Sequence, residues 1–424
     1  MFQSAPTDRR RFLRNAAGSF LGVSFAQQTL FAGENIASGK RSPKRVIYLF
    51  MAGGMSHIDT LNPRPDAPSE IRGKFSAIKT NADGVLLSET LPGIGKHTDK
   101  AVVFNSLTST QGAHQQGQYY MQTNYTKRGT ISHPHLGAWQ GRLNGKGNET
   151  LPGFIRINGG SNGPGNGFLP AEYAPLDIGK PSAGLENSAH YKGVGAPEFD
   201  KNLALARKLD QKFRARYDDR RISAYTSMYD DAVKLMRSGD LKAFDLGEET
   251  AEMRERYGDD SFGQGCLLAR RLTERGVRFV EVRLGGWDTH ADNFDRVAEK
   301  TATLDRAMSA LIGDLTSRGQ LEDTMVVLAS EFGRTPKINQ NAGRDHYPKA
   351  YSAMIVGGGI KGGQTYGTTD STGAEVEENK LEVQSFNATV AYGMGADVNE
   401  TIETSSRRPF TIANKGKAVT ELWS

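Results

Sequence analysis

The chain has 424 residues, 37% of them hydrophobic, and a net charge of +5. This length is ample for a buried core of one large domain or a few smaller ones. Much of the positive excess lies within the first 45 residues, and no aromatic–basic nucleic-acid motif is present, so we expect no nucleic-acid partner. The single cysteine, Cys266, excludes an intrachain disulfide and is expected to be a buried structural thiol.

The N-terminal segment carries an export pattern. Arg9 and Arg10 precede a short apolar run from Ala16 to Ala26, which is shorter than the roughly 20 apolar residues that span a bilayer. This pattern predicts a twin-arginine signal peptide and leader at residues 1–37, no permanent membrane anchor, and a periplasmic or extracellular protein. The alternative interpretation is a basic amphipathic arm. Residues 44–424 are then expected to form one domain.

Short apolar runs alternate with longer amphipathic stretches after residue 44. The pattern predicts strands at 45–52, 100–107, 277–285, 324–330 and 351–358, and helices at 115–123, 261–276 and 294–319. Residues 129–200 are rich in Gly, Pro and Asn and read as an inserted, loop-rich region, whereas 201–256 read as one or two long charged helices. Alternation of strands and helices predicts an α/β fold with a mostly parallel central sheet covered by helices on both faces.

Acids, imidazoles and cations follow or precede these strands at what we expect to be one edge of the sheet. Asp59 comes after the first strand, Asp288 and His290 follow 277–285, and Glu331 and Arg334 follow 324–330. Arg344 and His346 stand just before 351–358. Ligand sites of such folds lie beyond the carboxyl ends of the strands, so these distant segments are expected to meet.

Mixed carboxylates and imidazoles suit a divalent ion such as zinc, manganese, magnesium or calcium, and two such ions can clamp an oxyanion. The expected ligands for one or two metals are Asp59, Asp288, His290, Glu331 and His346. Arg334 and Arg344 are expected to stabilise the oxyanion. Each residue also has a structural interpretation: Asp288 as a helix cap, Asp59 in an Asx turn, Glu331 paired with Arg334, and His346 as a structural histidine.

Five segments then carry a family resemblance: LFMAGGMSHIDTLNPRP (49–65), GGWDTH (285–290), SEFGRTPKIN (330–339), GRDHYP (343–348) and GGGIKGGQTYGTTD (357–370). With the twin-arginine leader they resemble a large family of exported bacterial proteins related to sulfatases within the alkaline phosphatase superfamily. The resemblance implies an alkaline-phosphatase-like α/β domain with a two-metal site.

Carried over residue by residue, the resemblance places metal ligands at Asp288 with His290 or Asp292, and at His346. Glu331 stands at the position of a sulfatase acid, and Asp59 substitutes for an aspartate of the first strand. His114 falls at the nucleophile position, where relatives carry cysteine or serine. Attack by a metal-held hydroxide, a phosphohistidine intermediate and the absence of catalysis all stay open.

These observations predict an exported, metal-dependent hydrolase of phosphate or sulfate esters. The expected substrate is an anionic ester or a sulfated or phosphorylated saccharide. The expected catalytic residues are His114, Arg334 and Arg344, with His114 either at the nucleophile position or orienting the leaving group. The alternative is a non-catalytic exported protein whose degenerate site binds an anion or polysaccharide. A third reading is a structural core held by ion pairs alone.

Overall fold

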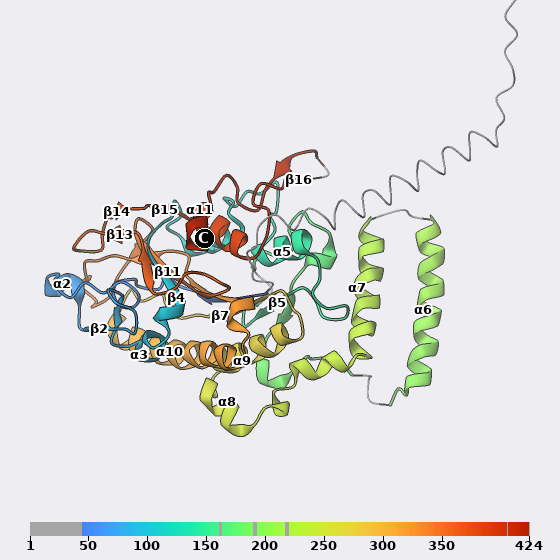
Figure 1. The fold of residues 1–424 in the computed structure, drawn as a ribbon. Helices are drawn as coiled ribbons and strands as arrows, with labels where there is room; N and C mark the ends of the chain where they lie inside the picture. Colours follow the sequence, from blue (N-terminus) through green and yellow to red (C-terminus); the bar gives the residue numbers. More distant parts are fainter. Residues whose placement is uncertain (1–44, 161–162, 190–192, 217–219, 405, 424) are drawn as a thin grey trace, which may run out of the picture. The chain divides into compact units, whose positions relative to one another are not determined.

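Strand β1 (Arg45–Met51) lies in the middle of a nine-stranded sheet in the computed structural model (Figure 1). The structure describes residues 45–160, 163–189, 193–216, 220–404 and 406–423. The expected twin-arginine leader lies outside these residues. No helix in the described part of the chain is both long and apolar enough to cross a membrane.

The sheet has the strand order β12-β4-β11-β8-β1-β7-β5-β6, with β15 paired to β4. Its other strands are β4 (Ala101–Thr108), β5 (Phe154–Ile157), β6 (Leu176–Ile178), β7 (Phe279–Leu284), β8 (Thr324–Ala329), β11 (Tyr351–Gly357), β12 (Gln364–Tyr366) and β15 (Leu381–Glu382). β11 is antiparallel to both neighbours, and the other pairings within the sheet are parallel. The mostly parallel sheet expected from the sequence is therefore confirmed.

Strand β1 shows why both faces of the sheet are covered. Its side chains alternate, so Ile47 and Leu49 enter one buried cluster while Tyr48 and Phe50 enter the other. Helices α9 (Ser261–Glu274) and α10 (Asn293–Ser317) contribute to the first cluster. Helices α4 (His114–Thr123), α5 (Leu136–Asn144) and α11 (Val383–Gly393) contribute to the second (Figure 1).

Residues 129–200 differ from the expected insertion. This region supplies α5 and two strands of the main sheet, β5 and β6, which pair with each other in parallel. The strands have four and three residues. Runs this short show no clear periodicity, and the surrounding Gly and Pro residues hide them in the sequence.

The remaining elements are helices outside the sheet and small two-stranded pairs. The expected long charged helices are α6 (Ala196–Arg216) and α7 (Arg220–Met236), joined by an ion pair of Arg207 with Asp230 at 2.8 Å. Short helices are α2 (Ser69–Arg72), α3 (Pro92–Gly95) and α8 (Ala251–Tyr257). The pairs are β2 (Ala77–Lys79) with β3 (Leu86–Ser88), β9 (Gly333–Arg334) with β10 (His346–Tyr347), β13 (Thr368–Thr369) with β14 (Val376–Glu378), and β16 (Ile402–Glu403) with β17 (Pro409–Phe410).

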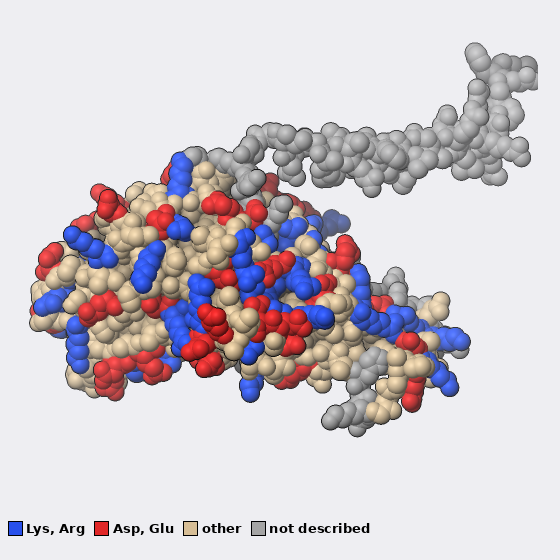
Figure 2. Space-filling view, turned by 60° about the horizontal axis from the view of Figure 1, so that its bottom comes forward, with Lys and Arg blue, Asp and Glu red and all other residues tan. Residues whose placement is uncertain are grey.

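Charges of both signs are mixed on one face of the molecule. On the face shown in Figure 2, Lys and Arg side chains are interspersed with Asp and Glu. At one edge of the sheet, β1, β7 and β8 end and the antiparallel β11 begins.

Candidate metal centre

His114 is the first residue of α4, which follows β4 after a five-residue loop. Gly117 N–H donates to the carbonyl of Ala113, so the N–H groups of residues 114–116 precede the first bond of the helix. His114 is thus placed at the carboxyl edge of the sheet, beside an N-terminal helix end that favours negative charge.

Asp288 and His290 lie in the loop after β7, and Gly53 lets this loop touch the end of β1. Gly53 has φ +123°, and a Cβ there would lie 2.5 Å from the backbone nitrogen of Asp288. Any other residue would push the two loops apart. The peptide N–H of Trp287 also donates to the carbonyl of Ala52 at 3.3 Å. The close contact fixes where the Asp288 carboxylate points.

The short β9–β10 pair delivers His346 to the same place. In this pair His346 lies directly opposite Arg334. The guanidinium of Arg334 donates to Asp288 Oδ1 at 2.6 Å and also to the carbonyls of Gly53, Gly54 and Arg344. Arg334 is fully buried, so it ties the ends of three chain segments together beneath the site.

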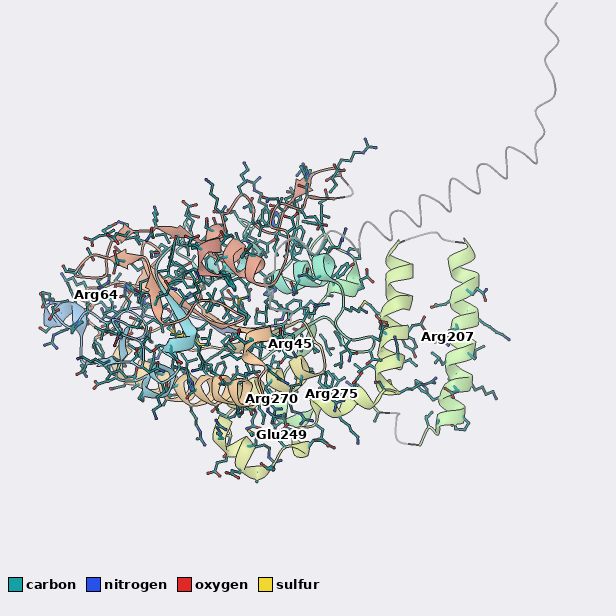
Figure 3. All side chains as sticks on the ribbon, in the orientation of Figure 1. Arg45, Arg64, Arg207, Glu249, Arg270 and Arg275 are labelled. Atoms are coloured by element: carbon teal, nitrogen blue, oxygen red, sulfur yellow. The ribbon has the colours of Figure 1, made fainter. Side chains whose placement is uncertain are left out.

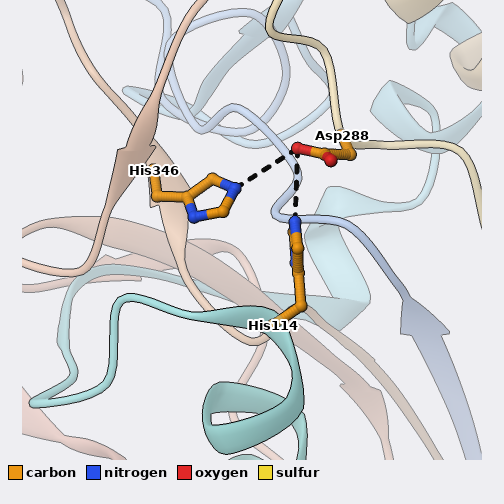
Figure 4. Close-up of side chains that lie close together, drawn as sticks. All are labelled: His114, Asp288 and His346. Atoms are coloured by element: carbon orange, nitrogen blue, oxygen red, sulfur yellow. Dashed lines mark hydrogen bonds and ion pairs between the residues drawn. The ribbon is translucent and has the colours of Figure 1, made fainter.

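Three imidazoles converge on one carboxylate oxygen. Asp288 Oδ1 lies 3.2 Å from Nε2 of His114, 3.1 Å from Nε2 of His290 and 3.3 Å from Nε2 of His346 (Figure 4 draws His114, Asp288 and His346). The ligand atoms of the three residues in the figure all lie within 4.8 Å of one another, which is close enough for one ion. The side chain of Asp288 is 46% exposed, so the cluster is open to solvent.

An oxygen acceptor lies against the other ring nitrogen of each histidine. Nδ1 of His114 is 2.9 Å from Glu331 Oε1, and Nδ1 of His290 is 2.7 Å from Asp345 Oδ1. Nδ1 of His346 is 2.8 Å from the carbonyl oxygen of Gly112. A carbonyl or ionised carboxylate only accepts, so Nδ1 carries the proton in each neutral ring and Nε2 keeps its lone pair. Three lone pairs therefore face the same carboxylate.

This arrangement needs a cation. Nε2 of His114 is shielded from solvent and has no partner with hydrogen-bond geometry among the described residues, although Asp288 Oδ1 is only 3.2 Å away. Lone pairs of neutral imidazoles repel a carboxylate, unless protons or a metal ion stand between them. Imidazoles held through Nδ1 by an oxygen acceptor are the usual setting of metal-binding histidines. The donor set fits a divalent metal.

The electrostatics of Glu331 support this orientation of His114. The carboxylate is fully buried and also accepts from the backbone N–H of Gly53 at 2.9 Å and from Gln118 Nε2 at 3.0 Å. Burial raises the pKa of Glu331, but the hydrogen bonds from His114 and Gln118 outweigh it and leave that pKa below its usual value. In return, the hydrogen bond to Glu331 raises the pKa of His114.

Asp288 stays ionised for a similar reason. Burial raises its pKa, but the hydrogen bond and charge of Arg334, with the nearby His114, hold the pKa well below its usual range. Burial lowers the pKa of His346. The site thus combines a permanently charged carboxylate with an imidazole that is easily deprotonated, which suits metal binding.

Asp59 and Arg344 are not brought into this cluster. The two form a fully buried ion pair in which Nε and Nη2 of Arg344 donate to Asp59 at 2.8 and 3.1 Å. Ser56 and Asn293 donate to the same carboxylate, and Arg344 also donates to the carbonyls of Thr335, Pro336 and Ile71. These contacts give Asp59 and Arg344 a structural setting, which differs from the expected metal-ligand and oxyanion roles.

Sequence reasoning did not assign the groups that orient the histidines. Asp345 was visible as the neighbour of His346, but its partner turns out to be His290. Gln118 lies one turn after His114 on α4, a spacing that could have indicated a shared face. The carbonyl of Gly112 leaves no trace in side-chain identity, so no signal could have identified it.

Comparisons with known proteins show distant likeness to several solved structures. The PsFucS1 sulfatase from Pseudoalteromonas sp. is 15% identical, with a TM-score of 0.41 over 87% of this chain and 70% of that chain. The C-terminal periplasmic domain of EcEptC from Escherichia coli, in complex with zinc, is 9% identical, with a TM-score of 0.38 over 88% and 87%. Phosphonate monoester hydrolase SpPMH from Silicibacter pomeroyi is 12% identical, with a TM-score of 0.32 over 90% and 76%.

Sequence comparison gives a firmer placement than these structures do. No curated protein matches the chain. The sequence model of one family, described as "Protein of unknown function (DUF1501)", matches residues 43–423. Because this match covers nearly the whole sequence, the chain belongs to the DUF1501 family.

Proposed function

We propose that this protein is a metal-dependent hydrolase of phosphate or sulfate esters, exported by the twin-arginine route to the periplasm or the extracellular space. The observation that carries the hydrolase proposal is the convergence of three oriented imidazoles on Asp288 at a solvent-open edge of the sheet. The export proposal rests on the arginine pair and apolar run of residues 9–26. The substrates we propose are anionic esters, sulfated or phosphorylated saccharides among them.

The residues that would hold the metal are His114, Asp288 and His346, with His290 as a further ligand from the exposed side. Three nitrogens and one carboxylate oxygen suit zinc best and manganese next, whereas magnesium and calcium prefer ligand sets made of oxygen. When bound, a divalent ion would supply Lewis acidity and would lower the pKa of a water molecule bound to it to about 7. Glu331 and Asp345 orient two of the imidazoles from behind.

An anionic substrate is favoured by the position of the site. The N–H groups of residues 114–116 stand at the start of α4, next to the cluster, and a helix N-terminus attracts negative charge. Asp288 and His290 are each 46% exposed, so a ligand has access from solvent. The edge therefore combines a metal-binding set, an approach from solvent and backbone donors for oxyanions.

His114 serves as a ligand in this proposal and not as the nucleophile expected from its position. Its Nδ1 is bound to Glu331, and its Nε2 points at Asp288 together with two other imidazoles. A residue that shares a metal in this way has no free nitrogen with which to attack a substrate. Attack by water is therefore the route that we propose, with the His114 imidazole held by Glu331.

One observation favours the second candidate, a binding protein without catalysis. Among the described residues, no hydroxyl or thiol group contacts the polar atoms of His114, Asp288 or His346. A cluster that only binds an anion would look the same. The two functions therefore have to be separated by a measurement of turnover.

The test loads the purified protein with one equivalent of zinc or manganese and measures hydrolysis of an aryl phosphate and an aryl sulfate. We expect turnover that chelation abolishes and that zinc or manganese restores. The Asp288→Ala variant is the matched control, since it lacks the shared carboxylate. A protein that binds the metal tightly but turns over neither ester with any divalent ion would favour the binding function instead.

A further inference from the structure

The proposed function leaves one chemical need unmet, and the inference below rests on that function. A phosphate or sulfate ester needs a cation for the oxygens that do not contact the metal. The two arginines expected for this task are both fully buried and already donate to the protein. Arg334 donates to three carbonyls and Asp288, and Arg344 to Asp59 and three carbonyls. Another basic residue has to be sought at the same edge.

Arg283 occupies a suitable place in the fold. It is the next-to-last residue of β7, whose carboxyl end leads into the Asp288 loop. Val280 and Val282 enter the buried cluster of the α9 and α10 face, so the alternation along the strand places Arg283 on the opposite face, where α4 packs. Arg283 thus lies on the α4 side of the edge at which the metal-binding set gathers.

The contacts of Arg283 link it to His114. Its Nη2 donates to Gln118 Oε1 at 2.7 Å, and Gln118 Nε2 donates to Glu331 Oε1 at 3.0 Å. The same Glu331 oxygen lies 2.9 Å from Nδ1 of His114. The hydrogen-bonded path from Arg283 to His114 thus passes through two side chains, Gln118 and Glu331.

Most of the donors of Arg283 are free to bind a ligand. Within the described part of the chain, the bond to Gln118 is its one side-chain hydrogen bond, and no ion pair is formed. The guanidinium carbon lies 5.6 Å from the ring centre of Phe50, which supports the planar group from below. The residue is half-buried, and an arginine has five N–H donors in a fork that matches phosphate and sulfate oxygens.

We propose that Arg283 binds the anionic group of the ester substrate, with Gln118 holding the guanidinium in place beside the metal-binding histidines. It takes the oxyanion role that the sequence assigned to Arg334 and Arg344. Because Gln118 contacts Arg283 and Glu331 at once, it couples the position of the anion-binding group to the orientation of His114.

A structural role is the competing explanation. Arg283 stands two residues from the buried Glu281, and its charge could serve only to compensate that carboxylate. However, Glu281 already forms an ion pair with His135 at 2.7 Å and accepts two bonds from Gln122. Compensation of Glu281 predicts a change in thermal stability with unchanged anion affinity, so the two explanations differ in a measurable quantity.

The experiment measures binding of zinc and of inorganic phosphate by calorimetry for the wild type, Arg283→Met, Arg283→Lys and Arg278→Met. Arg278 is the matched control because it precedes the same strand at the opposite edge, where its Nε donates to the carbonyl of Gly145 at 2.7 Å. Arg283→Lys keeps the charge without the fork, and it serves as a second variant if the methionine variant folds poorly.

We expect Arg283→Met to weaken phosphate binding by about 10-fold or more, as the loss of a charge-assisted bond implies, with zinc affinity unchanged. The phosphate affinity of Arg283→Lys should lie between those of the wild type and Arg283→Met, and Arg278→Met should bind phosphate like the wild type. Unchanged phosphate affinity in Arg283→Met, or an equal loss in the Arg278 control, would overturn the proposal. If the wild type does not bind zinc, that result contradicts the proposed function and not the role of Arg283. Titration of the metal-free protein with phosphate still measures the Arg283 contact.

Discussion

Two charged clusters of this protein differ in how their charges are compensated. One is the set at the sheet edge, where three imidazoles face Asp288. The other is buried between α8, α9 and α10, where Arg270 lies 2.6 Å from Glu274, 2.8 Å from Glu249 and 3.0 Å from Asp314 (Figure 3 labels Arg270 and Glu249). The comparison contrasts the proposed metal site with a cluster that compensates its own charges.

The Arg270 cluster is closed and complementary. The side chain of Arg270 is 1% exposed, and Asp314 has a second cation, Arg318, at 2.8 Å. Opposite charges alternate there, so each carboxylate has at least one cation within 3.2 Å. At the sheet edge, the lone pairs of three imidazoles face one negative oxygen of Asp288. Groups that the protein does not satisfy by itself indicate a ligand.

Removal of Arg270 should give the largest effect. Arg270→Met leaves three carboxylates short of a buried cation, so we expect a loss of roughly 3–5 kcal/mol in the free energy of unfolding. Zinc affinity should not change, because α9 carries no member of the metal-binding set. Urea denaturation and zinc titration measure the two quantities. A variant that unfolds like the wild type would show that the buried cluster adds nothing to stability.

Asp288→Ala should weaken zinc binding and leave the stability of the fold largely unchanged. We expect zinc affinity to fall by about 100-fold or more. Loss of a residue that only orients a ligand typically lowers metal affinity by about 10- to 100-fold, and loss of a ligand itself should cost at least as much. The fold should persist, because the side chain of Asp288 is 46% exposed and Arg334 keeps its bonds to the carbonyls of Gly53, Gly54 and Arg344. Calorimetric titration with zinc tests this, and equal affinity of variant and wild type would refute the site.

Glu331→Gln tests the orientation of His114 at nearly constant shape. A neutral amide can rotate its NH₂ group towards Nδ1, so the proton of His114 is no longer held there. We expect zinc affinity to fall by about 10- to 100-fold. Glu274→Gln, a carboxylate of the Arg270 cluster, is the matched control and should leave zinc affinity unchanged. If both variants bind zinc like the wild type, then Glu331 does not act on the metal through His114.

A change of one pH unit should alter zinc affinity less than the Asp288→Ala or Glu331→Gln substitution. Protons compete with the metal for Nε2, so affinity falls as the pH decreases, by up to about tenfold per unit for each proton displaced. The hydrogen bond that His114 donates to Glu331 raises the pKa of His114, so competition by protons begins above the ordinary histidine range. Asp288 stays ionised throughout. Titrations between pH 5.5 and 8 check this expectation, and a flat profile would contradict it.

The Arg270 cluster should not respond over the same pH range. Burial opposes ionisation of Glu249, but hydrogen bonds from Arg271 and Arg270 prevail and lower its pKa. A carboxylate with a lowered pKa stabilises the fold above its unfolded pKa, and that stability is lost only as the pH falls through the native value. The contribution of Glu249 to stability is therefore constant near neutral pH, whereas zinc affinity changes.

The sequence predicted the parts of the fold that follow from periodicity. Strands at 45–52, 324–330 and 351–358 and the helix at 294–319 correspond to β1, β8, β11 and α10. The edge at which Asp288 and Glu331 gather followed from the strands before them, because parallel strands end together. His346 precedes β11 and reaches this edge because β11 is antiparallel, which the sequence did not predict. The three-residue strand β6 was missed, since a run that short has no measurable period.

Pairing between distant residues could not be predicted from the sequence. Arg344 and Asp59 are 285 positions apart, and nothing in their local context indicates that each would be the other's partner. The same holds for Glu331, which contacts His114 from 217 positions away and so orients that imidazole. The residue types indicated the kind of chemistry. Which carboxylates are paired within the protein, and which are left to bind a ligand, depends on how distant segments pack.

Anomalous scattering from a zinc-loaded crystal tests the central claim most directly. The account predicts one strong peak within coordination distance of Nε2 of His114 and His346 and of the Asp288 carboxylate, and its loss in Asp288→Ala. No peak at these atoms after loading with zinc or manganese, or a peak bound only by other residues, would contradict it.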